Sequence, residues 1–256
     1  MPTLSPCLPT RALAPRLRRA VLAATLVLVP GLALPIAAQE GPKDFSAAER
    51  LLLMSPQLQG QRAGTRLSYR YHHGGSQEAG FDDQAAVLLA ARPDGQCCAA
   101  RGEFLSGERR LNLPEVEQAE GNPVVLYFLE RDIREMNRLT KGATNYFRKR
   151  IRMALYEAAT VRDVAASYQG RPVAAQEILL TPFLNDPNEA RFPQHVQRRY
   201  RFVLSKAVPG QVLAMQAVTP GAQAGGAPLA EDLLTLDGAT LPALQPYTPL
   251  AIRTTP

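Results

Sequence analysis

The stretch from Asn122 to Ala158 constrains the fold more than any other part of the sequence. Its apolar residues recur at spacings of three and four, which is the repeat of an amphipathic helix. Asn122 and Pro123 fit a helix N-cap and first helical position, and Gly142 fits a left-handed helix end. The pattern predicts two consecutive helices with two buried stripes: Leu126, Leu129, Ile133, Met136 and Leu139, then Phe147, Ile151, Ala154, Leu155 and Ala158.

The sequence on either side of these helices has the alternation of half-buried strands. Before the helices, the strand-like runs are 65–71, 83–92, 96–105 and 109–113. After them, the runs are 161–168, 173–181, 199–204 and 211–218. Blocks of strand, helix and strand favour an α+β fold over an alternating α/β fold. We therefore expect one domain with a curved, largely antiparallel sheet of about seven or eight strands, and with the helical pair packed on one face.

Residues 1–38 have the features of a cleaved secretory signal peptide. Four arginines and no acidic residue accompany an apolar run from Ala20 to about Leu34, and small residues precede Gln39. The alternative is a membrane anchor, which needs about 20 apolar residues. A proline and a glycine at positions 30 and 31 break the run, so we expect a periplasmic protein that does not span the membrane after cleavage.

Domain boundaries and partners follow from the composition of the remaining chain. We expect a single domain over residues 39–218 and a partly disordered tail, rich in Gly, Ala and Pro, over 219–256. The whole chain has a net charge of +6, but without residues 1–38 it holds 25 basic and 23 acidic residues. The remaining excess of +2 argues against a nucleic-acid partner.

Two adjacent pairs, Cys97-Cys98 and His72-His73, supply candidate ligands for a metal or redox function. Their spacing fits no zinc motif, and we expect the histidines to be exposed beside a turn. Neighbouring strand residues point to opposite faces, which predicts one buried and one exposed thiol. A disulfide within the Cys97-Cys98 pair, a link to another chain and a metal site remain alternatives. No cofactor is expected.

Signatures of familiar catalytic sites are absent from the sequence: it has no nucleophile elbow, zinc-protease motif, phosphate loop or dinucleotide fingerprint. A Ser-His-Asp arrangement would need one of the three histidines, and His195 lies in a polar segment that predicts a surface position. An envelope hydrolase with an unrecognised site is therefore the alternative to a binding protein.

A basic run on the second predicted helix is the main candidate for a binding site. Arg148, Lys149 and Arg152 lie on the face opposite the apolar stripe, with Tyr146 close by. Such a face can contact an anionic partner, such as lipid headgroups or lipopolysaccharide phosphates. The alternative is a solvated helix surface whose charges pair with nearby acidic residues.

Four segments, FLERDIREMNRLTKG, NYFRKRIR, PFLNDPNEARF and YRFVLSKAVPG, resemble an uncharacterised family of exported proteobacterial proteins over Phe45 to Val218. That family brings no catalytic residues. The order of elements is more distantly similar to periplasmic lipoprotein carriers, in which a curved sheet covered by helices holds acyl chains. Together these observations predict an exported, non-enzymatic module that binds a hydrophobic or anionic envelope ligand, or a protein partner.

Overall fold

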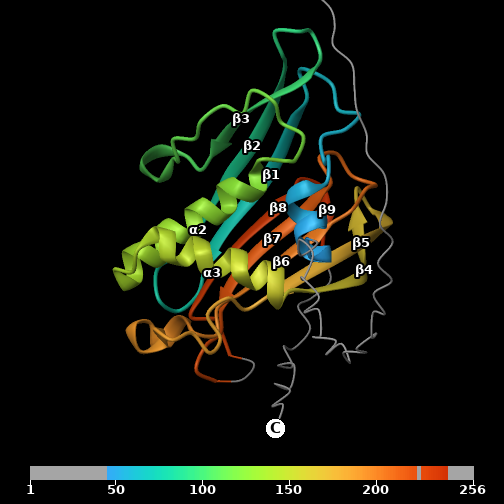
Figure 1. The fold of residues 1–256 in the computed structure, drawn as a ribbon. Coiled ribbons are helices and arrows are strands. Elements are labelled where there is room, and N and C mark those ends of the chain that lie inside the picture. The colour runs from blue at the N-terminus through green and yellow to red at the C-terminus, as the bar shows by residue number, and fades with distance from the viewer. Residues whose placement is uncertain (1–44, 224–225, 242–256) are drawn as a thin grey trace, which may run out of the picture. The chain divides into compact units, whose positions relative to one another are not determined.

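The computed structural model of the protein describes residues 45–223 and 226–241 (Figure 1). The elements in chain order are α1 (Ala47–Glu49), η1 (Arg50–Met54), β1 (Arg66–Gly74), β2 (Phe81–Ala91), β3 (Cys97–Phe104), η2 (Gly107–Arg109), α2 (Val124–Thr140), α3 (Thr144–Glu157), β4 (Thr160–Tyr168), β5 (Arg171–Leu180), η3 (Glu189–Arg191), η4 (Pro193–His195), β6 (Arg199–Leu204), β7 (Val212–Thr219), β8 (Ala230–Leu236) and β9 (Ala239–Thr240).

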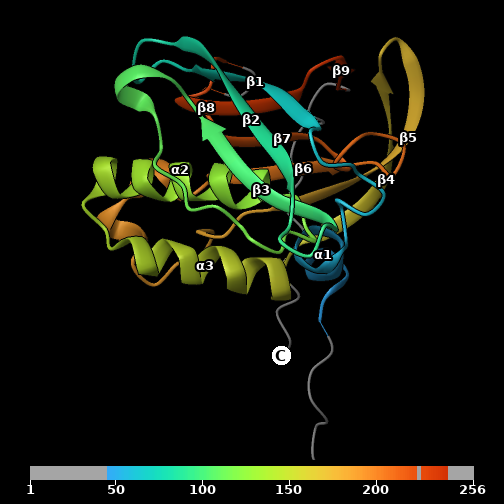
Figure 2. The same cartoon turned by 90° about the horizontal axis from the view of Figure 1, so that it is seen from above.

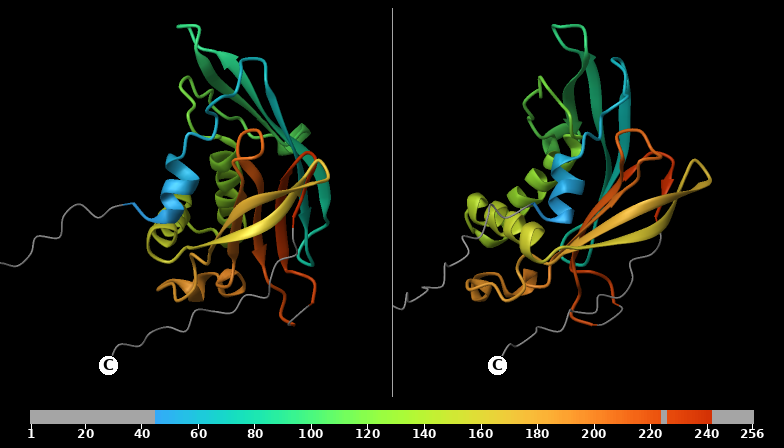
Figure 3. Two further views of the ribbon diagram at one scale, coloured as in Figure 1. Left: turned by 90° about the vertical axis from the view of Figure 1, so that its right-hand side faces the viewer. Right: turned by 45° about the vertical axis from the view of Figure 1, so that its right-hand side comes forward.

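The nine strands form one curved sheet in the order β3-β2-β1-β8-β7-β6-β5-β4-β9. Each pair of neighbours is antiparallel, and β8 joins the meander β1–β3 to the meander β4–β7. The helices α1, α2 and α3 lie on one face of the sheet (Figures 2 and 3). This arrangement confirms the predicted α+β fold with a helical pair on one face.

Strand β8 lies beyond residue 218, which was the predicted end of the domain. Its even-numbered residues are buried and its odd-numbered residues are half-buried, so it has a clear two-residue alternation. The Gly-, Ala- and Pro-rich segment before it concealed this short strand within a stretch that looked uniformly tail-like. Residues 242–256 of the expected tail, and the expected signal peptide, lie outside the described residues.

The helical pair was predicted with small errors of phase and position. In α3 the buried residues Phe147, Ile151, Ala154 and Leu155 match the predicted stripe, whereas Ala158 follows the helix and is exposed. In α2 the buried side is centred on Phe128, Ile133 and Met136, and Leu126 is exposed. The stripe is rotated because Tyr127 packs over Gly102 of β3, where a Cβ atom would lie 2.2 Å from the Tyr127 ring.

The ends of α2 also differ from the sequence expectation. Lys141, not Gly142, adopts the left-handed conformation at the C-terminal end, and Pro123 occupies the N-cap position. Asn122, one residue earlier, still makes the predicted capping bond, because its Oδ1 accepts from the Val124 backbone N–H at 3.2 Å. It is also buried, and its amide nitrogen donates to the Tyr69 hydroxyl and to the Gly210 carbonyl, each at 2.9 Å. These bonds fix the first turn of α2 to the sheet.

Several shorter segments also differ from the prediction. The predicted strand 109–113 makes only an isolated bridge between Leu111 and Phe104, and the segment between β5 and β6 contains two 3₁₀ turns, η3 and η4. Strand β1 extends through His73, which is buried, because its side chain faces Asp232 on the neighbouring strand. The expectation that both histidines are exposed is therefore wrong.

The phase of α3 predicts opposite effects for two nearby residues. Leu155 is 3% exposed, so Leu155→Ala should lower the free energy of unfolding by roughly 2–5 kcal/mol. Arg152 is exposed, so Arg152→Ala should cost less than about 1 kcal/mol. Denaturant midpoints of the two variants check this. The reverse order would mean that α3 packs through its basic side.

Candidate functional site

The exposed side of α3 contains a hollow with three basic residues at its walls. Its volume is about 380 Å³, and we call it the basic hollow; its lining residues are Glu49, Asn145, Arg148, Lys149, Arg152, Met153 and Tyr156. The α3 residues among them are separated by three and four positions or are neighbours, so they form one side of the helix. The opposite side is anchored in the core, and this fixes which way the basic residues point.

The positive charge of the basic hollow is only partly neutralised. The Arg148 guanidinium donates to the Glu130 carboxylate of α2 at 2.9 Å. Partial burial of Glu130 opposes its ionisation, but the hydrogen bonds from Arg148 and Arg134 lower its pKa. Within the described residues, Lys149 and Arg152 have no salt-bridge partner. Two full positive charges therefore remain available to an anionic ligand.

The structure separates Tyr146 from the other three predicted binding residues. Its hydroxyl donates to the Asp186 carboxylate and accepts a hydrogen bond from the Asn188 side chain at 3.0 Å. Arg150 pairs with the same Asp186 at 2.6 Å. Tyr146 and Arg150 thus hold the loop after β5 against α3, while Arg148, Lys149 and Arg152 line the basic hollow.

A second group of ionisable side chains lies between α2 and the sheet, where sequence reasoning did not expect one. Arg198 is 1% exposed and donates to Asp132 of α2, to Asp232 of β8 at 3.1 Å, and to Thr219 at 3.0 Å. The tyrosines at positions 71 and 200 donate to the same two carboxylates. We call this group the buried charged cluster: Tyr71, His73, Asp132, Arg198, Tyr200, Thr219 and Asp232.

The buried charged cluster is organised for charge balance. Burial opposes ionisation of Asp232, but its hydrogen bond with His73 and the charge of Arg198 lower its pKa below the usual range. Burial and the nearby Asp132 raise the pKa of Tyr200 well above its usual value, so that the hydroxyl stays protonated. The two aspartates therefore share the Arg198 guanidinium in the interior, with tyrosine hydroxyls as additional donors and with the positive charge of Arg131 nearby.

His195, expected at the surface, is also buried, at 3% exposed, because η4 turns its ring toward Thr219. Its Nδ1 lies 3.3 Å from the Thr219 hydroxyl, and burial together with the charge of Arg198 lowers its pKa. His195 is therefore explained as a neutral, packed residue of the interior, and its position gives no sign of a catalytic role.

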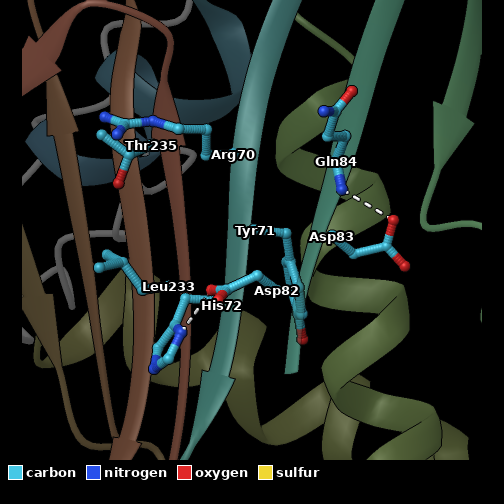
Figure 4. Close-up of a pocket in the computed structure, with 8 residues that line it drawn as sticks. All are labelled: Arg70, Tyr71, His72, Asp82, Asp83, Gln84, Leu233 and Thr235. Atoms are coloured by element: carbon cyan, nitrogen blue, oxygen red, sulfur yellow. Dashed lines mark hydrogen bonds and ion pairs between the residues drawn. The ribbon is translucent and has the colours of Figure 1, made fainter. Parts of the chain in front are cut away.

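The other histidine, His72, lies on the face of the sheet opposite the helices. It lines a hollow of about 590 Å³ with Arg70, Tyr71, Asp82, Asp83, Gln84, Leu233 and Thr235 (Figure 4). Its Nδ1 is 2.7 Å from an Asp82 oxygen, which orients the ring. Among the described residues no hydroxyl is hydrogen-bonded to His72, so the pair does not form a triad with a nucleophile.

The structure does not bring the two cysteines and two histidines together. Cys98 is buried and Cys97 is exposed, as predicted, but the two form a disulfide with each other instead of remaining free thiols. Cys97 pairs with Ala91 and His73 with Phe81, at opposite ends of β2. These ends are separated by about 30 Å, given the rise per residue of a strand. A single metal site built from all four residues is therefore excluded by the geometry.

The described helices include none that is both long and apolar enough to cross a bilayer. No protein-family model and no curated protein matches the chain. Among solved structures, the chain is similar to the lipoprotein LppX of Mycobacterium tuberculosis, with a TM-score of 0.29 and 11% identity over 70% of this chain and 88% of that one. A likeness at this level carries no statement about function, and the expected family stays a prediction.

Proposed function

We propose that the protein is an exported, non-enzymatic binding module of the periplasm that holds an anionic, phosphate-bearing ligand of the envelope in the basic hollow. The observation that carries the proposal is the convergence of Arg148, Lys149 and Arg152 on one hollow, with Lys149 and Arg152 unpaired by salt bridges within the described residues. Guanidinium and ammonium groups are the side chains that proteins use for phosphate oxygens. Export rests on the signal-like pattern of residues 1–38.

The interior of the fold supports a ligand at the surface rather than between the helices and the sheet. Large buried side chains, including Phe128, Met136 and Arg198, occupy the space under α2. An acyl chain placed there would have to displace them and would separate the carboxylates of the buried charged cluster from their arginine. Such a separation is costly, because it leaves charges uncompensated in the interior.

Binding to anionic vesicles tests the proposal. The wild-type protein should sediment with them at low ionic strength and dissociate at high salt, because each basic residue near the surface contributes on the order of 1 kcal/mol. Salt screens this attraction, with a Debye length of about 10 Å at 0.1 M. The triple variant Arg148→Glu, Lys149→Glu, Arg152→Glu should not sediment, while its thermal midpoint barely moves.

The control variant reverses three basic residues elsewhere: Arg62→Glu, Arg171→Glu, Lys206→Glu, all exposed. It has the same net charge as the α3 variant, so it separates a local site from a general charge effect. We expect it to sediment like the wild type. If both variants lose binding equally, or neither does, the basic hollow is not a binding site.

A further inference from the structure

We propose that the anionic partner of the basic hollow is a bilayer surface, which the protein contacts with α3 lying against the headgroups and with neighbouring apolar side chains entering the membrane. This inference rests on the proposed function, and it narrows the anionic ligand to one class, the surface of a lipid bilayer. A free phosphate compound could fill the basic hollow alone, whereas a bilayer also needs apolar residues beside it.

Such apolar residues are present on the helical side of the molecule. Among the described residues, the large hydrophobic side chains that are strongly exposed are Phe45 just before α1 at 54%, Leu53 and Met54 of η1 at 43% and 49%, and Leu126 of α2 at 57%. None of these four lies on a strand of the sheet. Single exposed hydrophobics are ordinary, but their restriction to the segments that border or contact the basic hollow indicates a common surface.

The α1–η1 segment borders the basic hollow on one side. Glu49, the last residue of α1, lines it, and the Ser46 hydroxyl donates to the Leu155 carbonyl of α3 at 3.0 Å. Ser46 and Glu49 also form a capping box, in which the Glu49 carboxylate accepts from the Ser46 backbone N–H at 2.9 Å. Leu53 follows Glu49 by about one helical turn and therefore lies on the same side of the segment.

Helix α2 contributes no lining residue, but it contacts the basic hollow through Arg148. The salt bridge between Arg148 and Glu130 joins the two helices at 2.9 Å. A connection of three residues makes α2 and α3 roughly antiparallel neighbours (Figure 2). Leu126 precedes Glu130 by one turn and Arg152 follows Arg148 by one turn, so both residues lie toward the same end of the pair.

This combination has the chemistry of an interfacial contact. Basic side chains attract the negative surface of an anionic bilayer, and apolar side chains beside them gain by leaving water for the boundary with the acyl chains. The charge and the apolar residues belong to different elements, α3 on one hand and α1–η1 and α2 on the other. The surface is therefore formed only when the helices are assembled on the sheet.

A tryptophan reporter tests the proposal directly, because the chain contains no tryptophan. In Leu53→Trp, anionic vesicles should shift the emission to the blue, and lipids brominated in their acyl chains should quench it. The matched control Leu233→Trp places the reporter on the opposite face of the sheet, where neither effect is expected. Inorganic phosphate at the same ionic strength should leave the emission of both variants unchanged.

A second variant measures the apolar contribution. Leu53→Ser, Met54→Ser should weaken binding to anionic vesicles by about tenfold or more, because it removes two apolar side chains that leave water on binding. Salt-sensitive sedimentation without a blue shift or quenching, and without loss in the serine variant, would overturn the bilayer contact and leave the anionic ligand standing. Failure of the wild type to sediment with any vesicle would overturn the proposed function as well.

Discussion

Replacing Arg198 with methionine should lower the free energy of unfolding by about 3–5 kcal/mol, the largest effect expected of any polar residue in the protein. Methionine fills a similar volume but carries no charge. The buried carboxylates of Asp132 on α2 and Asp232 on β8 would then lose the guanidinium that donates hydrogen bonds to both of them. Because Arg198 helps to lower the pKa of Asp232, its loss removes part of what keeps that carboxylate ionised in the interior.

Equilibrium unfolding in urea measures this effect, and two further variants show its origin. Arg171→Met removes an exposed arginine and should change stability by less than about 0.5 kcal/mol. In Arg198→Met combined with Asp132→Asn and Asp232→Asn, most of the loss should be recovered, because no charge remains uncompensated. A cost below about 1 kcal/mol for Arg198→Met alone would mean that water reaches the buried charged cluster.

The sequence predicted those parts of the fold that depend on local pattern. Phe147, Ile151 and Leu155 were assigned to the buried side of α3 because a helix repeats every 3.6 residues, and the structure confirms them. The alternation in 199–204 and in 161–168 predicted β6 and β4 within one residue. In α3 the burial follows the helical repeat, whereas β6 is buried on both faces, so the alternation predicted that strand but not which of its residues are buried.

The errors arose where distant residues decide the outcome. Leu126 fits an apolar stripe, yet it is exposed because Gly102 of β3 admits Tyr127 instead. Arg198 and Asp232 are 34 positions apart, and nothing near either one indicates that both are buried beside α2. Strand β8 was missed because a Gly-, Ala- and Pro-rich segment precedes it and because one of its buried positions is Asp232, which pairs with the distant Arg198.

The sequence also predicted only the part of the candidate site that lies on one helix. Arg148, Lys149 and Arg152 share one side of α3 by helical spacing, so the sequence alone could group them. The residues that complete the surface come from elsewhere in the chain, such as Glu49 and Leu53. Tyr146 was grouped with the basic residues because it is close in sequence, but its hydroxyl donates a hydrogen bond to Asp186 in the loop after β5.

Phe147→Ala should be the most destabilising change in the helical pair, at about 3–5 kcal/mol. Its side chain is fully buried, and its ring makes edge-to-face contacts with Phe183 and Phe192 at centroid distances of 5.6 and 5.9 Å. These contacts join α3 to the loop that leads from β5 to β6. Removing the ring would leave a cavity that three separate segments would have to fill.

A double-mutant cycle distinguishes this cluster from independent contacts. If Phe147 and Phe192 pack as one unit, the combined variant Phe147→Ala, Phe192→Ala should cost less than the sum of the single changes, by about 0.5–3 kcal/mol. Phe147→Leu should cost less than Phe147→Ala, since it keeps most of the buried volume. Additive costs in urea unfolding would mean that the two rings contribute to stability independently of each other.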